Sequence, residues 1–273
     1  MVSKLNNKNM KICFFSRLLF NSFPRSSIIS GVNRISNLTC GFVRVKSNAN
    51  EIKTISFLYF MLKGTQTLAG YTANQVVFFF LSFNLVDVLA QFLFREVYRF
   101  RPLVVSGDLD LVLAKPSSAL FRVLMGGADV VDLITIPPLI FAIYYVAGSL
   151  QPTFFQSLLY IVLILNGLLI ATAFHIAVLS LGIITLEIDH TIMIYRDITN
   201  LGRFPVDIYR QPLRGVLTYL LPVGIMMTLP AKALMGIITP LGVGISLGLA
   251  AVGIFLSLRF WNLALRQYTS ASS

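Results

Sequence analysis

The sequence predicts an all-α fold, a bundle of helices that crosses a membrane several times. Apolar residues make up 56% of the 273 positions and charged residues only 12%, with a mean hydropathy of +0.79. Soluble domains carry about 25% charged residues, and a surface this poor in charge would aggregate in water. Long apolar stretches also alternate with short charged segments, which is the pattern of an integral membrane protein.

Five apolar stretches are long enough, or nearly so, to cross a bilayer as helices. They cover residues 74–94, 123–148, 154–184, 216–236 and 241–258. A sixth stretch, 52–62, has only about half of the ~20 residues that a span requires, so we expect an incomplete first span. Pro230, Lys232 and Pro240 interrupt the apolar pattern further on. We interpret residues 230–240 as a short helix or re-entrant segment at the outer surface.

The positive charges predict the orientation, because Lys and Arg are retained on the cytoplasmic side. Five bases lie in 95–122, four in 196–214 and two in 259–266. If the spans alternate, these three segments share one side. The loops opposite them, 63–73 and 149–153, carry only one base. We therefore predict a cytoplasmic C-terminus, and six crossings if the N-terminus is also inside.

Residues 1–51 form a basic leader, rich in Ser and Asn, that differs from the rest of the chain. Residues 1–53 hold nine Lys or Arg against one acid and so supply +8 of the net charge of +11. We expect the leader to be disordered or misassigned, through a wrong start or a shifted reading frame; an organellar transit peptide is the alternative. The membrane domain is expected at 52–268, with a short tail at 269–273. Since the basicity is concentrated in the leader, we expect no nucleic-acid binding.

The common sequence motifs of ATP-binding proteins and zinc hydrolases are missing from the chain. It contains no GxxxxGK[ST] and no HExxH. We therefore predict no catalytic residues, no metal site and no ATP bound by this chain itself. His175 stands alone in an apolar span and is expected to hydrogen-bond a neighbouring helix. The two cysteines, Cys13 and Cys40, lie in the leader and offer no metal or disulfide framework.

Residues 95–122 form a charged segment between the second and third predicted spans. Such a segment cannot enter hydrocarbon and must lie at a membrane surface. It is too short for a domain and suits contact with another protein. Its candidate contact residues are Arg95, Glu96, Arg99, Arg101, Gly107, Asp108, Asp110, Lys115 and Pro116. A second charged segment, 186–215, is expected to pack beside it on the cytoplasmic side and contains the turn Gly202, Arg203, Phe204 and Pro205.

A polar stripe follows one face of the second predicted span: Asn84, Asp87, Gln91 and Arg95. Two interpretations stay open. The stripe lines a translocation path or a subunit seam, as intramembrane acids often do, or it is an internal hydrogen-bond ladder that ends at Arg95. Asp129 and Asp132 are expected to pair with Arg122 or with the cluster Arg95–Arg101, with ion coupling as the alternative.

Four separated motifs make the chain resemble the permease subunits of bacterial type-2 ABC exporters. They are LAGYTANQ at 68–75, VSGDLDLVLAKP at 105–116, LGRFPVDIY at 201–209 and LPVGIMMTLPAKAL at 221–234. The motifs occur in the order of that family, between the corresponding spans. The resemblance covers residues 55–273.

The resemblance implies a six-span permease in the plasma (inner) membrane, working as a homodimer or heterodimer with separate ABC ATPase subunits. ATP and Mg would be bound by those subunits, and segment 95–122 would transmit their closure to the bundle. Outer loops too small for a binding domain favour export over import. The remaining alternatives are a channel, a non-transport membrane scaffold and an intramembrane enzyme.

Overall fold

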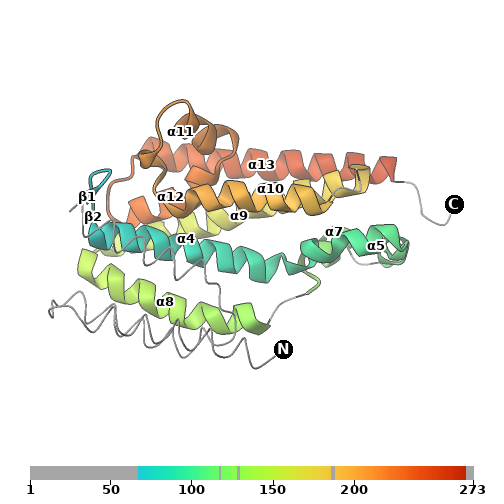
Figure 1. Ribbon diagram of the computed structural model, residues 1–273, viewed down its shortest axis with the longest axis horizontal. Helices are drawn as coiled ribbons and strands as arrows, with labels where there is room; N and C mark the ends of the chain where they lie inside the picture. The colour runs from blue at the N-terminus through green and yellow to red at the C-terminus, as the bar shows by residue number, and fades with distance from the viewer. Residues whose placement is uncertain (1–66, 117, 128–129, 186–187, 269–273) are drawn as a thin grey trace, which may run out of the picture. The chain divides into compact units, whose positions relative to one another are not determined.

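The computed structural model describes residues 67–268 apart from 117, 128–129 and 186–187, and this part is almost entirely helical (Figure 1). The predicted all-α membrane bundle is therefore confirmed. The leader at 1–51, the short apolar stretch at 52–62 and the tail at 269–273 lie outside the described residues.

Four helices among the described residues are long and apolar enough to cross a membrane. They are α4 (Ala73–Leu93), α8 (Val130–Leu150), α9 (Phe154–Thr185) and α13 (Pro240–Gln267). In Figure 1 these helices run along a common direction. At 1.5 Å per residue α4 is about 30 Å long, which matches the hydrocarbon core of a bilayer.

The two ends of α4 serve as reference points for the bundle. The chain enters α4 at the Tyr71 end, through the hairpin of β1 (Thr67–Leu68) and β2 (Tyr71–Thr72). Gly70 takes a positive φ in the hairpin turn, a conformation that glycine adopts without steric cost. Thr72 and Gln75 then form a capping box that starts the helix. The chain leaves α4 at the opposite end, the Arg95 end.

At the Arg95 end the predicted loop consists of short helices. They are η1 (Arg95–Arg99), α5 (Phe100–Val105), α6 (Asp108–Leu113) and α7 (Ala119–Met125). Helices η1, α5 and α7 pack against α9. Helix α7 includes the first residues of the predicted third span at 123–148. That span in fact begins at Val130, because α7 ends before the glycine pair Gly126–Gly127.

After α9 the chain returns toward the Tyr71 end through α10 (Ile188–Asn200), η2 (Leu201–Arg203) and η3 (Val206–Ile208). The ring of Tyr195 lies 4.9 Å from that of His175 in α9. Farther along, the guanidinium of Arg203 lies 5.7 Å from the ring of Phe83, near the middle of α4. Asp207 then accepts a hydrogen bond from the hydroxyl of Tyr71.

This path corrects the expectation that 186–215 packs beside 95–122. Helix α10 packs on α5, but Asp207 lies beside Tyr71, at the other end of a helix about 30 Å long. The prediction is therefore wrong for the second half of the segment, including the turn at 202–205. The charged residues of α10 suggested a loop, whereas its apolar face packs on α9.

The region predicted as a span at 216–236 is not one continuous helix. This region forms a pair of helices, α11 (Leu213–Gly215) with η4 (Val216–Leu220) and then α12 (Val223–Leu234), bent by 88°. The bend falls at Pro222, before the interruption expected at 230–240. Arg214 at the start of the pair contacts Asp207, and Gly236 after its end lies against Gln156 in the first turn of α9. Since both ends of the pair meet the Tyr71 end of the bundle, we interpret it as a re-entrant pair.

Small and polar residues allow the long helices to approach one another closely. The amide of Asn166 in α9 donates to the hydroxyl of Ser246 in α13 at 2.6 Å. Gly167 faces α12, where a Cβ would lie 2.9 Å from the carbonyl oxygen of Met226. In a bilayer, helices associate through such packing and interhelical hydrogen bonds, because lipid is as apolar as the side chains.

Gly167→Ala should therefore lower the free energy of unfolding by about 1–3 kcal/mol, because the added methyl overlaps the backbone of α12. Gly248→Ala in α13 is the matched control, since a Cβ there meets nothing within 4 Å. Its expected effect is below about 0.5 kcal/mol. Reversible unfolding in mixed micelles measures both variants. An equal response of the two would contradict the close α9–α12 approach.

Candidate functional site

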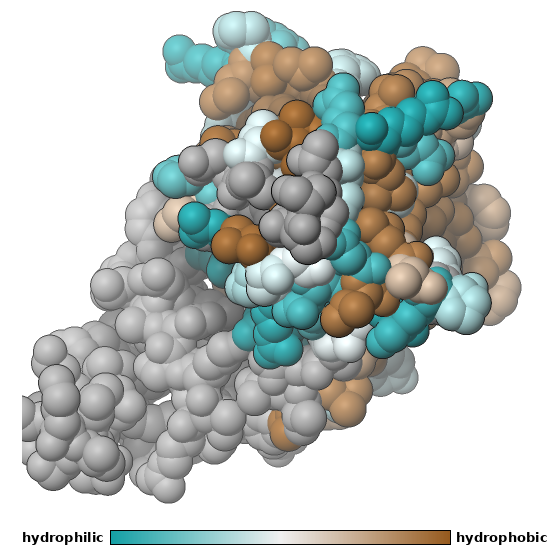
Figure 2. Space-filling model, turned by 90° about the vertical axis from the view of Figure 1, so that its right-hand side faces the viewer, coloured by the Kyte–Doolittle hydropathy of each residue, from teal (hydrophilic) through white to brown (hydrophobic). Residues whose placement is uncertain are grey.

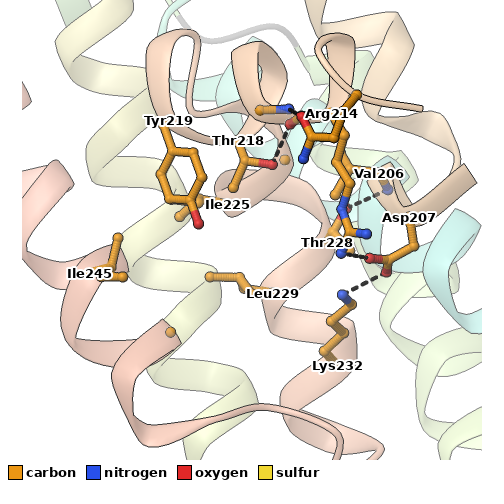
Figure 3. Close-up of a pocket in the computed structure, with 14 residues that line it drawn as sticks. Val206, Asp207, Arg214, Thr218, Tyr219, Ile225, Thr228, Leu229, Lys232 and Ile245 are labelled. Atoms are coloured by element: carbon orange, nitrogen blue, oxygen red, sulfur yellow. Dashed lines mark hydrogen bonds and ion pairs between the residues drawn. The ribbon is translucent and has the colours of Figure 1, made fainter. Parts of the chain in front are cut away.

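One carboxylate at the Tyr71 end binds three partners from separate parts of the chain. The Nζ of Lys232 lies 2.6 Å from Oδ2 of Asp207, and the hydroxyl of Tyr71 donates to the same oxygen at 2.7 Å. The guanidinium of Arg214 donates to Oδ1. Asp207 thus joins the chain before α4, the start of the re-entrant pair and α12. Figure 3 shows its contacts with Arg214 and Lys232.

The residues before Asp207 hold it against α12. A Cβ at Gly202 would lie 2.9 Å from Cγ1 of Val223, so η2 lies directly on α12. The backbone N–H of Val206 points to the hydroxyl of Thr228 at 3.4 Å. Lys232 lies one turn after Thr228, on the same face of α12. This register places the lysine beside Asp207.

The partners of Asp207 favour its ionised form. Burial alone would raise the pKa of Asp207, but hydrogen bonds from Lys232 and Tyr71, together with the charges of Lys232 and Arg214, hold it below its usual range. Burial and the hydrogen bond to Asp207 raise the pKa of Tyr71. The phenol therefore stays protonated and acts as a donor.

A cavity of about 260 Å³ opens beside Asp207, between the segment 206–219, α12 and α13 (Figure 3). One part of its lining is polar or charged: Asp207, Gln211, Arg214, Thr218, Thr228 and Lys232. Another part is largely apolar: Val206, Tyr219, Ile225, Leu229 and Ile245. The cavity is therefore amphipathic.

At the Arg95 end, the predicted contact segment presents charged and apolar side chains together. Arg99, Arg101, Asp108, Lys115 and Pro116 are exposed, and Arg95, Glu96, Gly107 and Asp110 are partly exposed. Leu111 and Phe121 are each 64% exposed. Figure 2 views the molecule from this end, where hydrophilic residues are interspersed with apolar ones. Exposed apolar groups among charges are typical of a protein contact surface.

Two ion pairs lie in this part of the structure. Arg99 lies 3.8 Å from Glu96 within η1, and Arg95 lies 4.0 Å from Asp132 in α8. The expected pairing of Asp132 with the cluster Arg95–Arg101 is therefore confirmed. Asp129 lies outside the described residues.

The predicted polar stripe forms bonds within its own helix. Gln91 donates to Oδ2 of Asp87 at 2.8 Å, and Asn84 donates to the backbone carbonyl of Phe80 at 2.7 Å. Both bonds fit the internal-ladder interpretation. A role of the stripe in a translocation path or a subunit seam stays a prediction.

His175 is buried among aromatic rings near the Arg95 end. Its Nδ1 lies 2.8 Å from the backbone carbonyl of Ala171, one turn earlier in α9. This partner belongs to its own helix, not to a neighbouring helix as expected. Its ring packs against Phe94 of α4 and Tyr195 of α10. Across the described residues, no three His, Cys, Asp or Glu side chains gather as a metal site.

The Asp207 cluster was not identified from the sequence, although a signal was present. Tyr71, Asp207 and Lys232 each lie in a different one of the four motifs that carry the family resemblance. The structure brings these three motifs together at one carboxylate. The fourth motif, at 105–116, contributes α6 at the opposite end.

A family model described as "ABC-2 family transporter protein" matches residues 49–272 of the chain. The match extends over all the described elements. No curated protein and no solved structure matches the chain.

Asp207→Ala should lower the free energy of unfolding by about 3 kcal/mol, because it leaves Lys232 largely buried without its anion. Lys232→Ala should have a similar effect, and the double variant should lose clearly less than the sum. Asp197→Ala, an exposed acid on α10, is the control and should change stability by less than about 0.5 kcal/mol. Additive losses in the double variant would show that the two residues are not coupled.

The lowered pKa of Asp207 also predicts how its stabilising effect depends on pH. Because the carboxyl titrates lower in the folded chain than in the unfolded chain, its contribution is complete above about pH 4 and is lost as the pH falls through the folded pKa. The stability difference between the wild type and Asp207→Asn should thus be constant near neutral pH and shrink in acid. Unfolding curves over a pH series measure it. A stability difference between the two proteins that grows in acid would contradict a lowered pKa of Asp207.

Proposed function

Because the chain belongs to the ABC-2 family of transporter proteins, we propose that it is the transmembrane permease subunit of an ATP-driven exporter. It is a multi-pass membrane protein, and permeases of this family work with ABC ATPase partners. In this proposal the ATPase subunits bind ATP and Mg, whereas this chain supplies the path and has no catalytic role. A second permease, identical or related, completes the path in the plasma (inner) membrane.

The observation that carries the proposal is the two-sided character of α6. Leu109 is fully buried, whereas Leu111, about 200° away around the helix, is 64% exposed. One face of α6 is thus anchored to the bundle while another is free for a partner. Gly107 takes a positive φ at the start of this helix, and Asp108 and Asp110 in its first turn suit the positive end of the helix dipole.

Contacts behind α6 can pass a displacement into the spans. Arg95 pairs with Asp132 at the start of α8, while η1, α5 and α7 pack on α9. An ATPase that pulls on α6 would therefore act on α8 and α9 together. This is how we propose that ATP-driven closure reaches the membrane part.

We place the Arg95 end in the cytoplasm. The bases of segment 95–122 lie there, together with Arg259 and Arg266, because α13 runs parallel to α9 from the Tyr71 end. Arg210 and Arg214, expected on the same side, lie instead at the Tyr71 end. On the opposite side, only residues 151–153 connect α8 to α9. Neither this connection nor the hairpin and the re-entrant pair at the same end is large enough to form a substrate-binding domain, which favours export.

The position of Leu111 gives a direct test of the ATPase contact. In a chain with Cys13 and Cys40 changed to Ser, a cysteine at Leu111 should crosslink to the ABC ATPase that co-purifies with the permease. A cysteine at Leu220 is the matched control, because Leu220 is a comparably exposed leucine, at 73%, in the re-entrant pair. Crosslinks from 220, with none from 111, would refute the coupling assignment.

A further inference from the structure

The cavity beside Asp207 has an unbalanced charge. Its lining contains two cations, Arg214 and Lys232, and one carboxylate, Asp207. The side chains of Lys232 and Asp207 are only 17% and 15% exposed, so water screens them weakly. Net charge in such surroundings is costly unless an ion of opposite sign lies close by. The charged part of the cavity lining therefore favours a ligand with one negative charge.

Arg214 is the cation best placed to bind such a ligand. Its side chain is 46% exposed, and a guanidinium carries five N–H donors, of which Asp207 accepts one from Nη2. Arg214 can thus bind a second oxyanion while it keeps its contact with Asp207. Gln211 adds a neutral donor, because its amide oxygen accepts from the N–H of Gly215 and its NH₂ group remains a donor.

The rest of the cavity suits an apolar chain. Tyr219, Ile225, Leu229 and Ile245 form its apolar lining. Leucines next to the lining residues in the chain are exposed, 73% for Leu220 and 75% for Leu241. At about 260 Å³ the cavity lies just below the ~300–1,000 Å³ of pockets for drug-sized ligands. It can therefore enclose a headgroup and the first part of a chain, with the remainder lying over the exposed leucines.

We propose that this cavity binds an anionic amphiphile, a molecule in which a carboxylate or phosphate group is attached to an apolar chain. The anionic group lies against Arg214, and the chain passes Tyr219 toward Leu220. The site lies at the opposite end of the bundle from the ATPase contact surface. The residues that line it all belong to this chain, so binding can be tested on the permease alone.

Equilibrium binding of radiolabelled dodecanoate to the purified full chain tests the proposal, in a sterol-based detergent that has no alkyl chain. Binding should be saturable, and dodecyl phosphate should displace the label. Dodecanol lacks the charge and inorganic phosphate lacks the apolar chain. Each should compete at least about tenfold more weakly than dodecyl phosphate, because each can make only the apolar or only the ionic contact.

Two variants separate the two halves of the site. Arg214→Gln should raise the Kd for dodecanoate at least about tenfold, whereas Arg210→Gln, an exposed arginine outside the cavity lining, should leave it unchanged. Because Arg214→Gln also disturbs Asp207, Ile245→Trp provides an independent test. It fills the apolar side of the cavity without altering a charge, and should weaken binding to a similar degree.

Several results would overturn the proposal. Equal competition by dodecanol would show that the charge has no role, and equal competition by inorganic phosphate would indicate a site for free anions only. The absence of saturable binding, or a Kd unaffected by both Arg214→Gln and Ile245→Trp in variants that unfold at the wild-type temperature, would exclude this cavity. None of these results bears on the crosslink from Leu111, so failure here and failure of the exporter proposal are distinguishable.

Discussion

The carboxylate of Asp207, held between Tyr71, Arg214 and Lys232, determines where the separate parts of this membrane bundle meet. Tyr71 precedes α4, Asp207 ends the path that returns from the Arg95 end, and Lys232 lies on the last turns of α12. An acid this little exposed is stable only while its cations stay beside it. The three segments are therefore constrained together, and with them the re-entrant pair and the start of α13.

The two ends of α4 are built on different physical principles. At the Tyr71 end, ionic contacts and hydrogen bonds join segments that are distant in sequence. At the Arg95 end, the short helices are held mainly by buried apolar residues such as Phe100 and Leu109, with the Arg95–Asp132 ion pair beside them, and they expose charges together with Leu111. The first arrangement suits a fixed structural junction with a ligand cavity beside it. The arrangement at the Arg95 end suits a surface that another protein binds and displaces.

Sequence reasoning located α4 and α9 almost to the residue, because both are uninterrupted apolar runs between turn or charged residues. It failed between residues 186 and 239, where the charges of α10 resemble those of a loop although its apolar face packs on α9. Composition also cannot show whether an apolar stretch crosses or turns back, so the bend at Pro222 was missed. The surface at 95–122 could be found because its charges are contiguous. The Asp207 cluster was missed, since its members are far apart in the chain and meet only through the path of α10.

Residues 188–209 carry the chain from the Arg95 end to the Tyr71 end, so the two ends should face opposite sides of the membrane. Single cysteines at the exposed positions Arg101 and Arg210 test this directly, in a chain whose Cys13 and Cys40 are changed to Ser. With a membrane-impermeant maleimide, position 210 should be labelled in intact cells. Position 101 should be labelled only after the membrane is permeabilised. Labelling of both positions from the same side would contradict the account.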